Sequence, residues 1–177
     1  MSREKSTELS AELGNELGNE LGNEMGADIK RERFWERYPL AELNASEWEA
    51  LCDGCGRCCL HKLEYEDTGE IDFTRIACRL LDLSTAQCSD YAGRQKKVPD
   101  CVQLTAANVS EIDWLPGTCA YRRMNEGRGL PHWHPLLTGN PESVIKANIS
   151  VIGRVLPETA VHEDDYQEHV IRWIRRS

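Results

Sequence analysis

Four cysteines fall within eight residues in the segment Cys52-Asp53-Gly54-Cys55-Gly56-Arg57-Cys58-Cys59. Four more follow further along the chain, at Cys78, Cys88, Cys101 and Cys119. A buried cysteine packs like a small hydrophobic residue, and packing alone gives no reason to gather such residues in one short segment. The pattern therefore indicates metal ligands, with the clustered four as the first candidates and the later four as the second.

The spacing within the segment suits a bound ion. Two residues between cysteines let a tight turn bring both sulfurs to about 2.3 Å from one zinc ion, and glycine permits the positive φ that such a turn requires. Gly54 and Gly56 stand at these positions. The adjacent pair Cys58-Cys59 differs, because neighbouring side chains are expected to diverge. A polynuclear site and a single ion with spare thiols both remain open.

Disulfides are the main alternative to metal ligation. Eight cysteines would permit four bridges in a secreted protein, but the acidic, polar N-terminus does not resemble a secretory signal. No stretch approaches the ~20 apolar residues of a membrane helix. We therefore expect a cytoplasmic protein with no membrane association, in a compartment that keeps thiols reduced. Metal ligation is favoured, and free or redox-active thiols are the third interpretation.

The charge balance bears on possible partners. The net charge is -9, and residues 1–30 contribute three basic and seven acidic side chains, which leaves 18 basic and 23 acidic ones in the remainder. Binding to a phosphate backbone usually relies on a clustered basic surface. The acidic balance therefore disfavours nucleic acid as a partner, whereas a protein partner remains open.

The chain divides into two parts. Residues 8–27 repeat a Glu-Leu-Gly-Asn pattern every four residues, and each glycine costs a helix about 1 kcal/mol relative to alanine. We predict that residues 1–30 form a low-complexity extension that is disordered or weakly helical. Residues 31–177 have the length of one cysteine-cluster metal-binding domain.

We expect this domain to be a small, irregular α+β fold with short helices and few strands around a cysteine-ligated metal site. The sequence Asn44-Ala45-Ser46-Glu47 is typical of a capping box and predicts a helix over 45–51 that delivers Cys52. The other expected elements are helices over 34–38, 105–112, 119–126 and 163–176, strands over 71–73 and 149–156, and a turn at 68–69.

Several other residues are secondary candidates for the site. Cys119 is expected in the first turn of a helix, where the helix dipole should favour its thiolate, which suits a ligand and a reactive thiol equally. Histidine could supply further ligands, although hydrogen bonding is the more common role when eight thiols are available. The histidines concerned are His61, His132 and His134. Arginines could offset thiolate charge, although surface roles are more common for them: Arg57, Arg79, Arg94 and Arg122.

A family resemblance extends beyond the first cysteines. It rests on the CxxCxxCC run and on the stretches Ala77-Cys78-Arg79, Pro99-Asp100-Cys101, Trp114-Leu115-Pro116, Thr118-Cys119-Ala120-Tyr121-Arg122 and Trp133-His134-Pro135-Leu136-Leu137-Thr138-Gly139. With these features the chain resembles the YcgN-type branch of the CxxCxxCC cysteine-cluster proteins over residues 32–175. The resemblance implies a zinc- or iron-chelating domain, and it implies no particular reaction, substrate or partner.

The sequence therefore predicts a metal-binding protein, most simply a metal-structured binding or regulatory module. An all-sulfur ligand set suits zinc, or iron in an iron-sulfur cluster. An iron-sulfur or thiol redox enzyme and a metal-handling protein are the alternatives. Catalysis has no positive sequence evidence, because no nucleotide loop, nucleophile-base-acid set or HExxH run is present.

Overall fold

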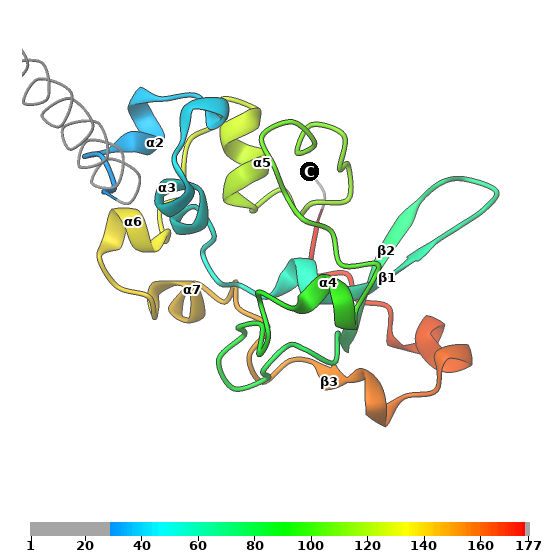
Figure 1. The fold of residues 1–177 in the computed structure, drawn as a ribbon. Coiled ribbons are helices and arrows are strands. Elements are labelled where there is room, and N and C mark those ends of the chain that lie inside the picture. The colour runs from blue at the N-terminus through cyan, green and yellow to red at the C-terminus, as the bar shows by residue number, and fades with distance from the viewer. Residues whose placement is uncertain (1–28, 176–177) are drawn as a thin grey trace, which may run out of the picture.

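The computed structural model describes residues 29–175. The predicted extension over residues 1–30 thus lies outside the described residues except for Ile29 and Lys30. Short helices account for most of the regular structure (Figure 1). The α-helices are α2 Phe34–Arg37, α3 Ala45–Ala50, α4 Arg94–Lys97, α5 Ala120–Asn125, α6 Pro135–Thr138 and α7 Ser143–Lys146. The 3₁₀ helices are η1 Leu40–Glu42, η2 Arg57–Cys59, η3 Glu158–Ala160 and η4 Glu163–His169.

One three-stranded sheet has the order β1-β2-β3. Its strands are β1 Leu60–Glu64, β2 Ile71–Ala77 and β3 Leu156–Pro157. β1 and β2 are antiparallel, with Leu60 opposite Ala77, and β3 runs parallel to β2. Gly69 adopts a φ of 65° in the connection between β1 and β2, at the predicted turn. The α+β prediction is confirmed, and the predicted strand over 71–73 continues to Ala77.

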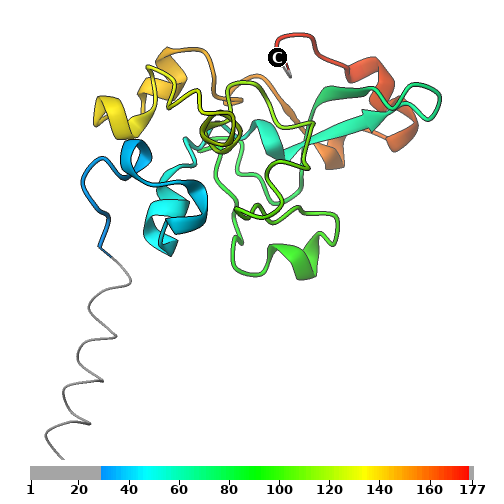
Figure 2. The same ribbon diagram turned by 90° about the horizontal axis from the view of Figure 1, so that it is seen from above.

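Two small hydrophobic cores lie on either side of the cysteine segment. The helix core comprises Phe34, Leu51, Val109, Leu115 and Tyr121. The sheet core comprises Leu60, Phe73, Ala77, Leu81, Ala86, Val151 and Ile174. Figures 1 and 2 place α2, α3 and α6 at one end of the molecule and the β1–β2 hairpin at the other. Trp114 packs against both cores.

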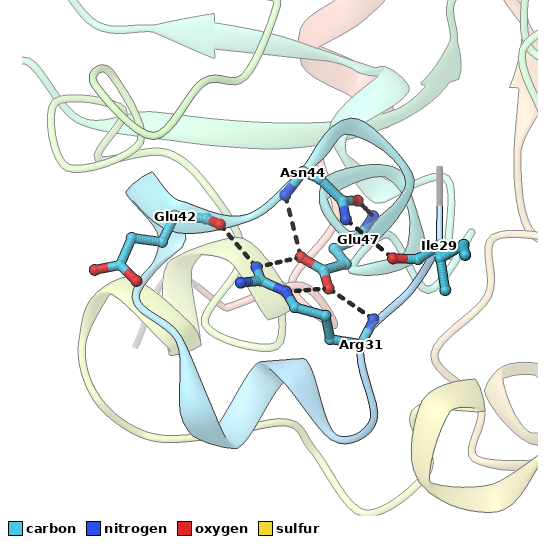
Figure 3. A network of polar contacts seen from close by, with 5 residues as sticks. All are labelled: Ile29, Arg31, Glu42, Asn44 and Glu47. Carbon is cyan, nitrogen blue, oxygen red and sulfur yellow. Dashed lines mark hydrogen bonds and ion pairs between the residues drawn. The ribbon is translucent and has the colours of Figure 1, made fainter. Parts of the chain in front are cut away.

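The predicted capping box begins α3 and is extended by an arginine. Asn44 Oδ1 accepts a hydrogen bond of 2.9 Å from the Glu47 N–H, and Glu47 Oε2 accepts one of 3.1 Å from the Asn44 N–H. Figure 3 shows the Arg31 guanidinium facing the same carboxylate, with Nη2 2.6 Å from Oε2. The Glu47 side chain is 0% exposed. These contacts hold the start of the described chain against the helix that leads into the cysteines.

Two predicted elements near the C-terminus are wrong. Most of the predicted strand over 149–156 is a series of turns, and only Leu156–Pro157 forms a strand. The Val151 N–H donates to the Cys55 carbonyl oxygen at 3.0 Å, and the Val151 side chain is fully buried in the sheet core. The alternating apolar residues in this segment therefore reflect packing against the cysteine segment rather than strand pairing.

The predicted C-terminal helix over 163–176 is also incorrect within the described residues. Its first half is the 3₁₀ helix η4, after which the chain passes through the bridge residue Val170 into bends over 172–174. Val170 pairs with Thr74, and the Ile171 N–H donates to the Phe73 carbonyl oxygen at 2.8 Å. Ile174 is buried as the pattern predicted. Backbone hydrogen bonds to β2 therefore form in place of helical hydrogen bonds, and the Ile174 side chain still faces the core.

The predicted helix over 105–112 is a run of turns. The Asn108 N–H donates to Thr105 Oγ1 at 3.2 Å, and the Thr105 N–H donates to Asn108 Oδ1 at 2.8 Å. This reciprocal pair has the arrangement of a capping box, but only turns follow it over 106–111. Val109 is nevertheless buried in the helix core, as its position in the pattern predicted.

No helix within residues 29–175 has both the length and the apolar character that crossing a bilayer would require.

Replacing Glu47 with glutamine is expected to destabilise the fold by roughly 1 to 2 kcal/mol at neutral pH. The variant loses a charge-assisted contact. The expected loss of unfolding free energy is kept small because Arg31 is 36% exposed and solvent screens its charge. Glu36→Gln is the matched control, since its partner Arg33 lies on the surface with 57% exposure. Urea unfolding of the three proteins measures the difference, and equal losses in both variants would contradict the role of Glu47.

The same difference should depend on pH. The hydrogen bond from Arg31 lowers the pKa of Glu47 from 4.5 to about 2. A lowered pKa in the folded state stabilises the protein fully above pH 4.5, and this contribution is lost as the pH falls towards 2. The stability gap between the wild type and Glu47→Gln should therefore close over that interval. Urea midpoints measured from pH 6 to pH 2.5 would detect it.

Candidate metal centre

The cysteine segment connects the two hydrophobic cores directly. Leu51, which follows α3, is fully buried in the helix core, and Leu60, which begins β1, is buried in the sheet core. All four clustered cysteines lie between them, in a loop and in η2. The predicted helix over 45–51 that delivers Cys52 is confirmed as α3, which ends one residue earlier, at Ala50.

Both glycines of the segment adopt the left-handed conformation that the spacing predicted. The φ angles are 69° at Gly54 and 76° at Gly56. A Cβ atom on Gly56 would lie 2.7 Å from Val151 Cγ2, and one on Gly54 would lie 2.7 Å from Gln87 Nε2. The loop thus requires glycine for its backbone angles and for its close approach to other segments.

Asp53 shapes the first turn of this loop. Its Oδ1 accepts a hydrogen bond of 3.1 Å from the Cys55 N–H. Its other carboxylate oxygen, Oδ2, is buried without a hydrogen-bond partner. A buried oxygen of this kind normally has a partner, so the loop contains one unsatisfied acceptor beside the cysteines.

All eight cysteines are free thiols. Cys52 and Cys58 are exposed, and the other six are partly buried. The Sγ atoms of Cys58 and Cys59 lie 3.9 Å apart, so the divergence expected of neighbouring side chains is not observed. The separation is far beyond the ~2.05 Å of a disulfide and close to the edge of about 3.8 Å in a tetrahedron with 2.3 Å metal-sulfur bonds. One shared ion and two ions in adjacent sites both suit it.

Backbone contacts bring three of the later cysteines to the segment. The Cys78 N–H donates to the Cys59 carbonyl oxygen at 2.9 Å. Cys88 pairs with Leu81, whose N–H donates to the Cys78 carbonyl oxygen at 2.9 Å. Cys119 is the N-cap residue of α5, and a side-chain contact fixes this helix to α3, since the Tyr121 hydroxyl, two residues later, donates to the Trp48 carbonyl oxygen at 2.8 Å.

The thiols interact electrostatically across the whole set. Burial raises the pKa of Cys52 to about 12, because protein atoms surround its sulfur although part of the residue is exposed, and Cys58 and Cys119 raise it further. Burial also raises the pKa of Cys55. Burial raises the pKa of Cys101, and the thiols of Cys78, Cys88 and Cys58 add to that rise. All eight cysteines therefore belong to one connected group.

Three thiols are affected by a hydrogen bond or by burial in a way that bears on their ionisation. The hydrogen bond between the neighbouring thiols lowers the pKa of Cys58 and raises the pKa of Cys59. Burial raises the pKa of Cys119 to about 12. The expectation that Cys119 ionises readily is therefore wrong, because desolvation outweighs the dipole of a helix only six residues long.

Two cations lie in and directly after the cysteine segment. Arg57 is only 4% exposed, and its Nε donates to the Ile149 carbonyl oxygen at 2.7 Å. Lys62 Nζ donates to the carbonyl oxygens of Cys58 and Leu60 at 2.9 and 2.8 Å and lies 4.1 Å from the centre of the Trp114 ring.

Among the charged groups around these two cations, cysteines have the strongest effect. Burial lowers the pKa of Arg57, and the charge of Cys55 is the largest effect that opposes this lowering. Burial also lowers the pKa of Lys62, and the largest opposing effects come from thiols. These thiols are Cys58, Cys59, Cys101 and Cys78. A buried cation is costly unless negative charge compensates it, and thiolates, with the Asp53 carboxylate in the case of Arg57, are the groups placed to do so.

The remaining arginines bind groups outside the cysteine set. Arg79 Nε lies 2.9 Å from Glu158 Oε1. Arg122 Nη1 donates to the Leu115 carbonyl oxygen at 2.6 Å. Arg94 stacks 3.7 Å from the centre of the Tyr91 ring, although its charge also lowers the pKa of Cys101.

The three histidines have other partners or positions. His61 Nε2 lies 2.7 Å from Glu158 Oε2, and His132 is exposed and packs edge-on against Trp133. His134 is fully buried; its Nδ1 accepts from the Leu136 N–H at 3.1 Å, so Nε2 carries the proton and donates to the Leu51 carbonyl oxygen at 3.0 Å. His134 thus fixes the residue before Cys52, and both of its ring nitrogens are used.

Comparison with known proteins identifies the family. A UPF0260 protein from Ectopseudomonas mendocina is 59% identical over 140 residues, which cover 79% of this chain and 94% of the relative. UPF0260 proteins from Azotobacter vinelandii and Marinobacter nauticus are 58% and 55% identical, and each alignment covers 80% of this chain and 95% of the relative. The chain belongs to the UPF0260 family.

The cysteines of this UPF0260 protein coincide with a known domain. Residues 51–120 match the CxxCxxCC family profile, which is described as "Putative zinc- or iron-chelating domain". The matched range contains all eight cysteines. The resemblance drawn from the sequence is thereby confirmed. No solved structure is similar enough to this chain to count as a match.

The conformation described for this UPF0260 protein does not itself form a coordination sphere. Within residues 29–175, no three Cys, His, Asp or Glu side chains converge on a point where they could hold a metal ion. The donor set nevertheless suits a thiolate-bound metal, because free thiols gather beside buried cations and an unsatisfied carboxylate oxygen. Each cysteine sulfur can be redirected by rotation about one torsion. The ligand assignment of the eight cysteines stays a prediction.

Two contributors to the site were not evident from the sequence. No pattern marks Lys62, because its aromatic partner Trp114 is distant in the sequence. His134 was considered as a ligand, and its bond to the Leu51 carbonyl oxygen depends on contact between distant segments. Arg57 was flagged by its place between the cysteines, although a surface role was expected for it and it is buried.

Replacing Gly56 with alanine is expected to destabilise the protein by about 2 kcal/mol or more, since it adds both a left-handed backbone penalty and a clash with Val151. Gly127→Ala is the matched control, because Gly127 has a φ of 68° and open space around it. Chemical unfolding should show the larger loss for Gly56→Ala. Val151→Ala in the Gly56→Ala background should recover part of it, and identical losses in the two glycine variants would contradict the steric requirement.

Proposed function

We propose that this UPF0260 protein is a metal-binding module in which a thiolate-bound zinc or iron centre joins the helix core to the sheet core. One observation carries the proposal: the cysteine segment begins directly after Leu51 of one core and ends directly before Leu60 of the other. Cys59 packs against the sheet core, and Cys119 packs against the helix core. A metal ion bound between these two cysteines would link the helix core to the sheet core.

The energetics support a structural role for the metal. Each hydrophobic core is small, and the segments between 78 and 119 contain little regular structure. Binding of structural zinc to thiolates provides on the order of 10 kcal/mol or more, comparable with the whole stability of an ordinary domain. Metal binding of this size would fix the irregular segments that carry Cys78, Cys88 and Cys101.

The protein would then act through a surface held in shape by the metal, as a binding or regulatory module. A redox function is the second candidate, because the eight thiols exceed the four that one tetrahedral ion needs. Thiols left over from ligation could exchange electrons with a partner. Absorbance separates these functions, because a zinc module is colourless whereas an iron-sulfur protein is brown and sensitive to oxygen.

The test is to purify the full chain without oxygen, to determine its metal content by elemental analysis, and to follow thermal unfolding. Cys55→Ser is expected to lose at least one bound ion per chain and to lower the melting temperature by about 10 °C or more. Val151→Ala is the control, because it removes packing from the same loop and leaves every thiol in place. It should melt earlier than the wild type and keep its full metal content.

Removal of metal by a chelator should lower the melting temperature of the wild type and scarcely change that of Cys55→Ser. If the purified chain holds no stoichiometric metal and chelators leave its melting curve unchanged, the proposed function is wrong.

A further inference from the structure

The last described residues, 170–175, connect two separate parts of the molecule, and we call them the C-terminal strap. At one end the Ile171 N–H donates to the Phe73 carbonyl oxygen of β2 at 2.8 Å. At the other end the Arg175 carbonyl oxygen accepts a hydrogen bond of 2.9 Å from the Gly117 N–H. Between these two bonds the backbone forms bends and neither helix nor strand. The C-terminal strap therefore joins β2 to the residues that precede α5.

Trp173, in the middle of the C-terminal strap, contacts two arginines. The guanidinium carbon of Arg154 lies 3.6 Å from the centre of the Trp173 ring, and that of Arg57 lies 5.5 Å from it. The face of a tryptophan ring is the most favourable aromatic surface for a cation. The Trp173 side chain also packs against the sheet core. Because Arg57 is only 4% exposed, this ring is one of the groups that cover the cation inside the cysteine segment.

The two arginines extend this contact to other segments. Arg57 Nε donates to the Ile149 carbonyl oxygen at 2.7 Å, and Arg57 Nη1 donates to Thr118 Oγ1 at 3.2 Å. Arg154 Nη1 donates to the carbonyl oxygen and to Oδ1 of Asn148, each at 3.1 Å. Asn148 has a φ of 58°, a left-handed conformation that asparagine tolerates better than most residues. The two guanidinium groups thus bind neighbouring residues of one turn, and Arg57 also binds the residue before the N-cap of α5.

The C-terminal strap is loosely packed on β2. An open cavity of 430 Å³ is lined by residues 71–73 of β2 and by four residues of the strap, namely Ile171, Arg172, Ile174 and Arg175. A segment at the end of a chain, with few backbone hydrogen bonds and incomplete packing, opens at a lower free energy than the core does. The attachment of the strap therefore depends on a few side chains, among them Trp173 and the buried Ile174.

We infer that the C-terminal strap holds the start of α5 and the cysteine segment together, with Trp173 as the positioning residue that acts through Arg57. Loss of the Trp173 ring frees the Arg57 guanidinium, and the N-cap residue Cys119 then loses the contacts that fix the two residues before it. The inference goes beyond the proposed function, because it concerns how the chain protects a thiol whether or not a metal ion is bound. Trp173 also lies outside the residues 51–120 that match the family profile.

The test compares two substitutions at one position of the full chain. Trp173→Phe keeps an aromatic face for the arginines, whereas Trp173→Leu keeps apolar bulk and removes that face. The proteins are reduced and freed of metal with a chelator, and hydrogen exchange is followed by mass spectrometry. Peptides that cover 117–119 and 148–151 should exchange about tenfold faster in Trp173→Leu than in the wild type. In Trp173→Phe their rates should stay within about threefold of the wild type.

Thiol alkylation provides a readout that general destabilisation does not reproduce. The same metal-free proteins are treated with iodoacetamide, and the modified cysteines are mapped by mass spectrometry. Cys119 should react about tenfold faster in Trp173→Leu than in the wild type. Cys88, which pairs with Leu81, should keep its wild-type rate. Leu83→Ala is the control, because it removes apolar packing from the same sheet core and leaves Trp173 in place, and it should not favour Cys119 over Cys88.

A third measurement uses only the wild type and so decides the question if Trp173→Leu does not fold. The C-terminal strap makes the hydrogen bonds of both the Ile171 N–H and the Gly117 N–H. If the strap opens as one unit, the two amides should exchange with the same opening free energy in nuclear magnetic resonance experiments. Opening free energies that differ between the two amides would overturn the inference.

The outcomes separate this inference from the proposed function, because every protein in these experiments is free of metal. Faster exchange at 117–119 and selective alkylation of Cys119 in Trp173→Leu would support the positioning role even for a chain that binds no ion. Equal exchange in Trp173→Leu and Trp173→Phe, or a wild-type rate of Cys119 alkylation in Trp173→Leu, would reject the role of Trp173 and leave the metal-binding module in place.

Discussion

The structure depends on how one loop is fixed at its two ends. Leu51 and Leu60 are both almost completely buried, and they belong to different hydrophobic cores. The loop between them has little freedom, because its glycines occupy left-handed backbone positions and one of them touches Val151. Since the ends and the turns of the loop are fixed by packing, the backbone that carries its four cysteines is held in place, although within residues 29–175 their side chains do not converge on a common point. A fixed backbone reduces the conformational entropy that ordering these side chains would otherwise cost.

Charge is the second organising feature of this region. Arg57 and Lys62 bring positive charge into protein surroundings, where isolated cations are unfavourable. Burial also holds most of the nearby thiols in their neutral form, as the raised pKa values of Cys52, Cys55 and Cys119 indicate. Without a bound ion the region therefore contains cations beside several thiols that stay protonated. A metal that replaces the thiol protons would add thiolate charge beside these cations.

Local sequence patterns predicted local structure well. The capping box at Asn44 and Glu47 is present because both of its partners lie within one helical turn. The glycines of the cysteine segment adopt positive φ because the turn chemistry is local too. Apolar periodicity identified Val109 and Ile174 as buried residues, yet it assigned both of their segments to helices that do not form. Periodicity reports which side chains avoid water, and it does not fix the backbone when other segments supply the hydrogen bonds.

The sequence by itself determined the family, the number of thiols and the loop that presents the first four of them. These features depend on residue identity and on spacing over a few positions. Only the tertiary structure decided which cysteines are neighbours, because contacts such as those of Cys78 with Cys59 and of Tyr121 with Trp48 join residues far apart in the chain. It likewise decided that Lys62 and Arg57 face the thiols and that His134 binds the Leu51 carbonyl oxygen. Long-range packing sets those partners, and no local pattern encodes them.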